Sequence, residues 1–71
     1  MPEKKLANNL KVYRASRNLT QEALADQVGV TRKTINVIEA GDYSPSVSLA
    51  LSIAEVFDVP VNDIFYLDDA K

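Results

Sequence analysis

The residues best suited to chemistry are two cations near the middle of the chain, Arg32 and Lys33. They fall in the first turn of a predicted helix, where the helix dipole disfavours a positive charge by roughly 0.3–1 kcal/mol each. Because folding gains nothing from cations at this position, we expect them to serve an external partner. A phosphate group, or the N7 and O6 acceptors of a guanine, would supply the missing compensation.

The predicted helix has two different sides. Ile35 and Ile38 fall on one side, which we expect to pack into the core. The other side carries Arg32, Lys33, Asn36 and Val37. Asn36 could bond an adenine or a phosphate, and Val37 is either a thymine-methyl contact or a tolerated surface residue. A helix of about nine residues is roughly 13 Å long, which fits a major groove about 12 Å wide.

Residues 20–41 predict two short helices joined by a tight turn. Thr20 is a candidate N-cap of the first helix, and Thr31 is a candidate N-cap of the second. Gly29 can take the positive φ that ends a helix. The apolar face of the first helix is formed by Ala23, Leu24, Ala25 and Val28. The second helix should therefore cross the first sharply.

This stretch resembles the helix-turn-helix of the phage Cro/repressor-type family of transcriptional regulators. The residues that carry the resemblance are Thr20-Gln21 through Leu24-Ala25, Gly29-Val30-Thr31, Thr34-Ile35, Ile38-Glu39 and Gly41. Residue type and spacing agree across both helices and the turn, so the match is specific. The resemblance implies an all-α, five-helix, lambda-repressor-like DNA-binding domain over residues 1–71.

The resemblance also implies a set of residues that contact double-stranded DNA: Gln21, Thr31, Arg32, Lys33, Thr34, Asn36, Val37, Tyr43 and Ser44. Arg32 and Lys33 are the positions that read base edges in the family. They stand where several phage relatives have two glutamines, so the operator sequence cannot be carried over. Thr31 is first of all a cap. Tyr43 and Ser44 either bond a phosphate or serve ordinary turn chemistry, and both interpretations stay open.

One ion pair is expected from the same resemblance. In the family, the arginine at the place of Arg14 pairs with the glutamate at the place of Glu39. We favour this pair over a solvated surface cation, because Glu39 beside Ile38 would otherwise be an acid near the core edge without a partner.

Composition narrows the possible functions. A chain of 71 residues is expected to form one small domain. It has no cysteine and no histidine, which argues against disulfides, thiolate zinc sites and the usual general base. No apolar run approaches the roughly 20 residues of a membrane span. We therefore expect a cytoplasmic protein with no cofactor, metal or small-molecule ligand, and we reject an enzyme.

Charge is distributed unevenly along the chain. Residues 1–40 carry seven lysines and arginines against four acids, whereas residues 41–71 carry one lysine against six acids. This asymmetry predicts a side that faces a polyanion and an opposite, acidic side.

The remaining segments predict further helices. Leu6, Leu10 and Tyr13 recur at helical spacing, which predicts a first helix over residues 6–17 that Asn18 closes. Ser46 can cap a helix over residues 47–57, and a fifth helix is predicted over residues 61–67. Residues 1–5 and 68–71 are expected to be loose.

Apolar residues near the C-terminus exceed what so small a core should absorb. They form a candidate homodimer interface made of Ile64, Phe65, Tyr66 and Leu67. Small stand-alone members of the family are homodimers. The resemblance also allows residues 6–7 to pair with residues 66–67 as a two-stranded ribbon, although helices are our prediction for both segments.

Two hypotheses about function follow. The first is a homodimeric, sequence-specific DNA-binding regulator, most simply a repressor, that binds a near-palindromic operator. The second is a protein-interaction module, such as an antitoxin or an inhibitor of another regulator, that uses the apolar C-terminal surface. A steep loss of DNA affinity with salt would favour the first hypothesis over the second.

Overall fold

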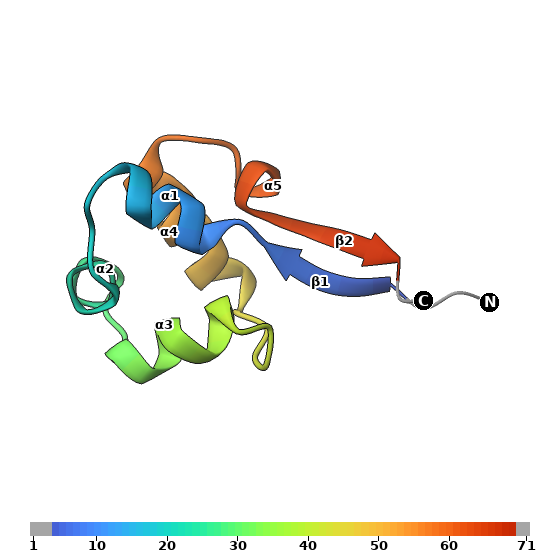
Figure 1. Cartoon of the computed structure of the whole chain (residues 1–71), viewed down its shortest axis with the longest axis horizontal. Coiled ribbons are helices and arrows are strands. Elements are labelled where there is room, and N and C mark those ends of the chain that lie inside the picture. The colour runs from blue at the N-terminus through green and yellow to red at the C-terminus, as the bar shows by residue number, and fades with distance from the viewer. Residues whose placement is uncertain (1–3, 70–71) are drawn as a thin grey trace.

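The computed structural model describes residues 4–69 as a cluster of helices from which a two-stranded ribbon projects (Figure 1). The elements in chain order are β1 (Lys4–Asn8), α1 (Leu10–Ser16), α2 (Gln21–Val28), α3 (Arg32–Glu39), α4 (Val47–Phe57), α5 (Val61–Ile64) and β2 (Phe65–Asp69).

Local sequence signals determine where the three central helices begin. The hydroxyl of Thr20 accepts a hydrogen bond from the N–H of Ala23, 3.0 Å away, at the start of α2. Thr31 does the same for α3, and Ser46 does it for α4. These three predicted caps are confirmed, and α4 has the predicted bounds, Val47–Phe57. Gly29 ends α2 with a φ of 77°, a backbone conformation that other residues adopt only at a cost.

The core is a single cluster to which every helix contributes. α3 gives Ile35 and Ile38, which belong to this cluster and are buried almost completely. The buried residues are Leu10, Leu24, Ala25, Ile35, Ile38, Ile53, Ala54, Phe57, Ile64 and Phe65. Because these side chains lie between the helices, burying them fixes the position of α3 relative to its neighbours.

The prediction of a first helix over residues 6–17 is wrong at its start. α1 begins at Leu10, and residues 4–8 form β1 instead. Asn8 lies at the junction of β1 and α1, where its side-chain oxygen accepts from the N–H of Leu10 at 3.1 Å and its amide donates to the carbonyl of Ile38 at 3.0 Å. These bonds give the backbone an alternative to a helical turn.

The fifth predicted helix is also too long. α5 ends at Ile64, whose carbonyl accepts from the N–H of Asn9 at 2.8 Å, and β2 follows. β1 and β2 pair antiparallel, with Leu6 opposite Leu67 and Ala7 opposite Tyr66. The five predicted helices are present, but the all-α prediction is wrong at both ends of the described residues, where the ribbon that the family resemblance allowed is found.

The predicted loose ends are only partly described. Residues 1–3 and 70–71 lie outside the described residues. Lys4 and Lys5 belong to β1, in register with Asp69 and Asp68 of β2. Over residues 4–69, none of the helices has both the length and the apolar character needed to cross a membrane.

Candidate nucleic-acid interface

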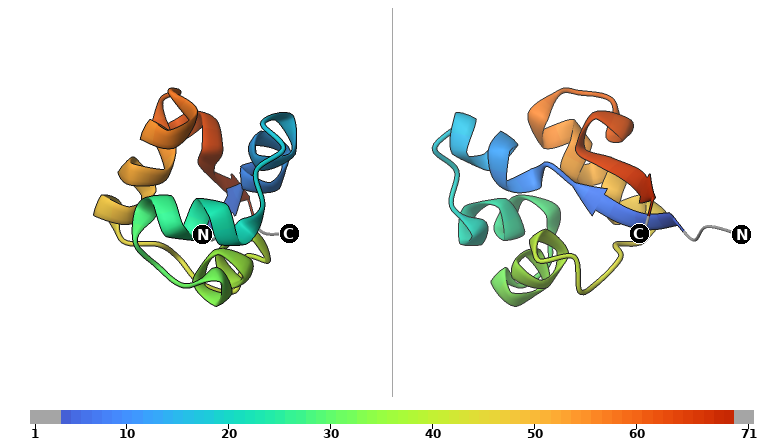
Figure 2. Two further views of the ribbon diagram at one scale, coloured as in Figure 1. Left: turned by 90° about the vertical axis from the view of Figure 1, so that its left-hand side faces the viewer. Right: turned by 45° about the vertical axis from the view of Figure 1, so that its right-hand side comes forward.

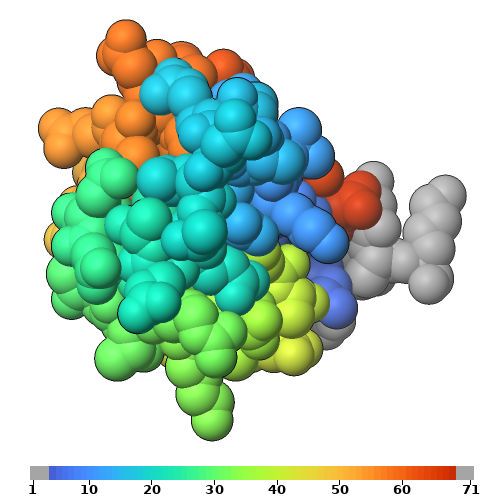
Figure 3. All heavy atoms as spheres, turned by 60° about the vertical axis from the view of Figure 1, so that its left-hand side comes forward, coloured from blue at the N-terminus to red at the C-terminus, as the bar shows by residue number. Residues whose placement is uncertain are grey.

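α3 lies along one edge of the helical cluster. Figure 1 shows α2 nearly end-on with α3 running past it, and the left view of Figure 2 shows α3 beneath α2. Ile35 and Ile38 hold the inner side in the core, while Arg32, Lys33 and Asn36 are exposed on the outer side. In Figure 3, side chains of the green segment that contains α3 protrude from the lower edge of the molecule. The predicted recognition surface is therefore accessible.

The turn between α2 and α3 is short and closed by backbone bonds. The N–H of Val30 donates to the carbonyl of Ala25 at 3.0 Å, which is the bond expected where a left-handed glycine ends a helix. Thr31 then caps α3, and its hydroxyl also lies 3.1 Å from the hydroxyl of Thr34. Thr31 and Thr34 are thus bonded to each other at the start of the helix.

Arg14 and Glu39 form an ion pair behind the outer side of α3. Arg14 donates through Nε to Glu39 Oε2 at 2.6 Å and through Nη2 to Oε1 at 3.1 Å. It also donates to the carbonyl of Leu19 at 2.9 Å. The side chains are only 16% and 8% exposed, and the bonds to Glu39 raise the pKa of Arg14 above its ordinary value. The pair fastens the end of α3 to α1.

Gln21 belongs to the same network. Its amide donates to Glu39 Oε1 at 3.0 Å, so a residue expected to contact DNA is held by the ion pair. A primary amide has two N–H donors and an acceptor oxygen, so capacity for a further partner remains. This bond cannot be predicted from local sequence, because it joins residues 18 apart and depends on how α2 packs on α3.

Arg17 contacts another residue of the same chain, Phe57. Its Nη2 donates to the carbonyl of Phe57 at 2.8 Å, and its guanidinium lies 5.8 Å from the centre of the Phe57 ring. The bond satisfies a carbonyl at the end of α4 that has no partner within the helix. Arg14 and Arg17 therefore account for two of the seven cations in the first half of the chain.

Arg32 and Lys33 have no such partner within the part of the chain that the structure describes. The ion pair between Arg14 and Glu39 is the salt bridge found among the side chains of residues 4–68. The first turn of α3 holds no acid. In the same range, no three side chains of the metal-ligating types come together.

The loop after α3 places Tyr43 and Ser44 at the surface. Both residues are exposed, and they come shortly after Gly41, whose φ is 82°. Tyr43 lies beside α3, because it shares a surface hollow with Val37. The structure brings the loop and the outer side of α3 together.

The predicted homodimer interface needs a correction. Ile64 and Phe65 are 0% and 8% exposed within a single chain, because they form part of the core. They are therefore not available to a second copy. Tyr66 and Leu67 are 41% and 64% exposed on β2.

Comparison with known proteins gives matches over most of the chain. A helix-turn-helix family model matches residues 10–64. An uncharacterised helix-turn-helix transcriptional regulator of Methanocaldococcus jannaschii is 53% identical over 64 residues, which cover 90% of this chain and 97% of the relative. A regulator of the same description from Bacillus subtilis, YgzD, is 44% identical over 64 residues, with the same coverage of 90% and 97%.

Two solved structures also superpose on most of the chain. A protein of Bacteroides fragilis described as DNA-binding superposes with a TM-score of 0.78 and 26% identity, covering 86% of this chain and 98% of that one. The restriction-modification controller protein C.AhdI of Aeromonas hydrophila superposes with a TM-score of 0.71 and 28% identity, covering 76% of this chain and 78% of that one.

Proposed function

Because this chain belongs to the Cro/C1-type helix-turn-helix family of transcriptional regulators, we propose that it is a repressor that binds a near-palindromic operator as a homodimer, with α3 in the major groove. Binding of DNA and regulation of transcription come with the family. We add three proposals to what the family gives: that the protein represses transcription, that its operator is near-palindromic, and that it binds as a homodimer.

The observation that carries the proposal is the display of Arg32 and Lys33 on the first turn of α3. Both are exposed, and neither has an anionic partner among the side chains of residues 4–68. Two cations at a helix N-terminus are unfavourable in the free protein by roughly 0.3–1 kcal/mol each. A bound guanine or phosphate would compensate this unfavourable free energy, so the two cations would stabilise the complex although they do not stabilise the fold.

The geometry of α3 suits a major groove. Its eight residues make a rod about 12 Å long, and the groove is about 12 Å wide. We assign base contacts to Arg32 and Lys33, and a base or phosphate contact to Asn36. Phosphate contacts are assigned to Gln21, Thr31, Thr34, Tyr43 and Ser44, which flank the outer side of α3.

Gln21 supports this assignment through its bond to Glu39. The bond holds the Gln21 amide in one orientation at the start of α2, where backbone N–H groups also point outward. A side chain that is already ordered loses less freedom when it bonds a phosphate. Glu39 therefore helps to orient Gln21 toward a phosphate, although Glu39 itself does not contact DNA.

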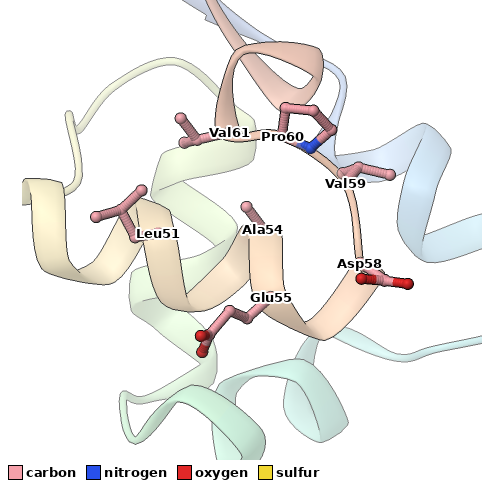
Figure 4. A pocket seen from close by; sticks show the side chains of 7 residues that line it. All are labelled: Leu51, Ala54, Glu55, Asp58, Val59, Pro60 and Val61. Carbon is pink, nitrogen blue, oxygen red and sulfur yellow. The ribbon is translucent and has the colours of Figure 1, made fainter.

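Exposed apolar surface supports the homodimer. Val47 and Leu51 are exposed one turn apart on α4, and Tyr66 and Leu67 are exposed on β2. Beside Leu51 lies an open hollow of about 540 Å³, lined by Leu51, Ala54, Glu55, Asp58, Val59, Pro60 and Val61 (Figure 4). A second copy covering such surface would form a dimer, and helix-turn-helix dimers bind half-sites about one helical turn of DNA apart.

Selection of duplexes from a random pool would test the proposal. We expect the retained sequences to share a motif with two-fold symmetry and half-sites about one helical turn apart. Affinity for the selected duplex should fall steeply with salt, with a slope of about −0.9 per phosphate contacted. Retention of a motif without symmetry would contradict the homodimer on a palindrome.

A second function is favoured by the same apolar surface. A protein-interaction module, acting as an antitoxin or as an inhibitor of another regulator, would use Tyr66, Leu67 and the exposed side of α4. In that case, no duplex would be enriched, and binding to a protein partner would change little with salt.

A further inference from the structure

A side-chain hydrogen bond joins the ribbon to α3. Asn8, the last residue of β1, donates through Nδ2 to the carbonyl of Ile38 at 3.0 Å, although the two residues are 30 apart in the chain. Its Oδ1 accepts at the same time from the N–H of Leu10 at 3.1 Å. An amide that is bonded at both its nitrogen and its oxygen is held in one orientation. The junction of β1 and α1 is therefore tied to α3.

Ile38 lies where α3 turns into the loop that follows it. Its carbonyl accepts from the N–H of Gly41 at 3.0 Å, and the carbonyl of Val37 accepts from the N–H of Asp42 at 3.0 Å. Gly41 has a φ of 82°, so these two bonds form the turn with which a left-handed glycine commonly ends a helix. A carbonyl oxygen has two lone pairs, and the Asn8 amide takes the one that this turn leaves free. Asn8 therefore helps to hold the turn from which the loop begins.

The loop carries two of the residues assigned to phosphates. Tyr43 and Ser44 come directly after this turn, and both are exposed. The far end of the loop is held by Ser46, whose hydroxyl accepts from the N–H of Leu49 at 3.1 Å. Because neither Tyr43 nor Ser44 is buried in the core, the position of their hydroxyls depends on how the two ends of the loop are held.

We propose that Asn8 is a positioning residue for DNA binding, because its bond to Ile38 holds the loop after α3 where the loop's hydroxyls reach a phosphate. This inference rests on the proposed function, since it concerns phosphate contacts that were assigned there. Contact groups that are already in place lose less freedom on binding, so losing the bond should weaken those contacts. Base contacts should be spared, because Arg32 begins α3 six residues, or about 9 Å along the helix axis, before Ile38.

The neighbouring residue offers a matched control. Asn9 donates through Nδ2 to the carbonyl of Asp63 at 3.3 Å, so it makes the same kind of bond, but to α5 instead of α3. Asn8→Asp and Asn9→Asp each replace an amide donor by a carboxylate of the same shape. Each also adds one negative charge, at adjacent positions in the chain. General repulsion of DNA is therefore matched, and of the two variants Asn8→Asp is the one that removes a bond to α3.

The first test measures affinity for the selected duplex at several salt concentrations. We expect Asn8→Asp to bind about tenfold more weakly than Asn9→Asp. Its slope of log affinity against log salt should be shallower by about 1.8, since each phosphate contact contributes about 0.9 and one is lost in each of two subunits. Preference at every base position should be unchanged. A residue that only stabilised the fold would lower the unfolding free energy without changing this slope.

The second test asks whether Asn8 acts through the loop. Tyr43→Phe combined with Ser44→Ala removes both hydroxyls, and adding Asn8→Asp to this variant should change the salt slope no further. Two results would overturn the inference and leave the proposed function intact. One is an equal slope for Asn8→Asp and Asn9→Asp. The other is a full effect of Asn8→Asp in the variant that lacks the hydroxyls.

Folding of each variant would be verified by far-ultraviolet circular dichroism. If the carboxylate of Asn8→Asp prevents folding, Asn8→Ala and Asn9→Ala, which add no charge, take the place of the two aspartate variants. The same tenfold difference in affinity and the same change in salt slope are then expected. If no duplex is enriched at all, the proposed function fails, and this inference fails with it.

Discussion

The cations at the end of α1 and those at the start of α3 are used in opposite ways. Arg14 and Arg17 lie near a helix C-terminus, where positive charge is favoured, and each donates to an acceptor within the fold. Arg32 and Lys33 lie at a helix N-terminus, where positive charge is disfavoured, and they face outward. Position in a helix, rather than charge alone, therefore separates the cations that bond within the fold from those that are left exposed.

Removing Arg14 should produce the largest change in stability. Arg14→Ala leaves Glu39, 8% exposed, without its cation, and it frees the carbonyl of Leu19. We expect the free energy of unfolding to fall by about 3 kcal/mol in urea titrations. Glu39→Gln, which still accepts hydrogen bonds, should cost less. Lys11→Ala is the control on α1 and should stay within about 0.5 kcal/mol of the unmodified protein.

Removing Arg32 should act on DNA binding instead. Arg32→Ala is expected to weaken binding to the selected duplex by about 1–3 kcal/mol and to relax preference at one base position. Its unfolding free energy should be unchanged or slightly higher, because an unfavourable charge is removed. Binding would be measured by fluorescence anisotropy at fixed salt. Unchanged affinity and base preference would show that Arg32 reads no base.

Removing Arg17 should have a smaller effect on stability, and it tests whether the cations at the end of α1 differ from those at the start of α3. Arg17→Ala removes the bond to the Phe57 carbonyl and the guanidinium contact with its ring, so we expect a loss of about 1 kcal/mol in unfolding free energy. Base preference on the selected duplex should not change. If that preference did relax, the division between structural and binding cations would not hold.

Reversing the charge of Lys33 should give a small change in stability, with a sign opposite to that of the Arg14 and Arg17 variants. Lys33→Glu puts an acid in the first turn of α3, which should raise the unfolding free energy by about 0.3–1 kcal/mol at low ionic strength. The gain should shrink in 1 M salt, because exposed charges are screened. Lys33→Gln should give about half the gain. A lower stability for Lys33→Glu in thermal unfolding would contradict the dipole argument.

The parts of the fold that depend only on residues close together in the sequence could be predicted from the sequence. Thr20, Thr31 and Ser46 cap helices through bonds that span three residues, and Gly29 ends α2 by its own backbone conformation. The outer side of α3 also follows from helical spacing alone. Such features are local, so a single sequence contains them.

The ribbon and the Gln21 bond could not be predicted with the same rules. Leu6 fits a helical pattern with Leu10, and only pairing with β2, about 60 residues away, makes it part of a strand. One available signal was the charge pattern, because Lys4 and Lys5 oppose Asp69 and Asp68 in register. For Gln21 there was no comparable signal, since its partner is decided by the packing of α2 on α3.

The ribbon has a consequence for anything joined to the protein. Lys4 lies opposite Asp69, so the chain enters and leaves the described structure at one place. Figure 1 shows the open end of the ribbon and the first turn of α3 at opposite ends of the long axis. A tag, a fluorophore or a fused protein joined at the open end of the ribbon would therefore be attached far from the first turn of α3.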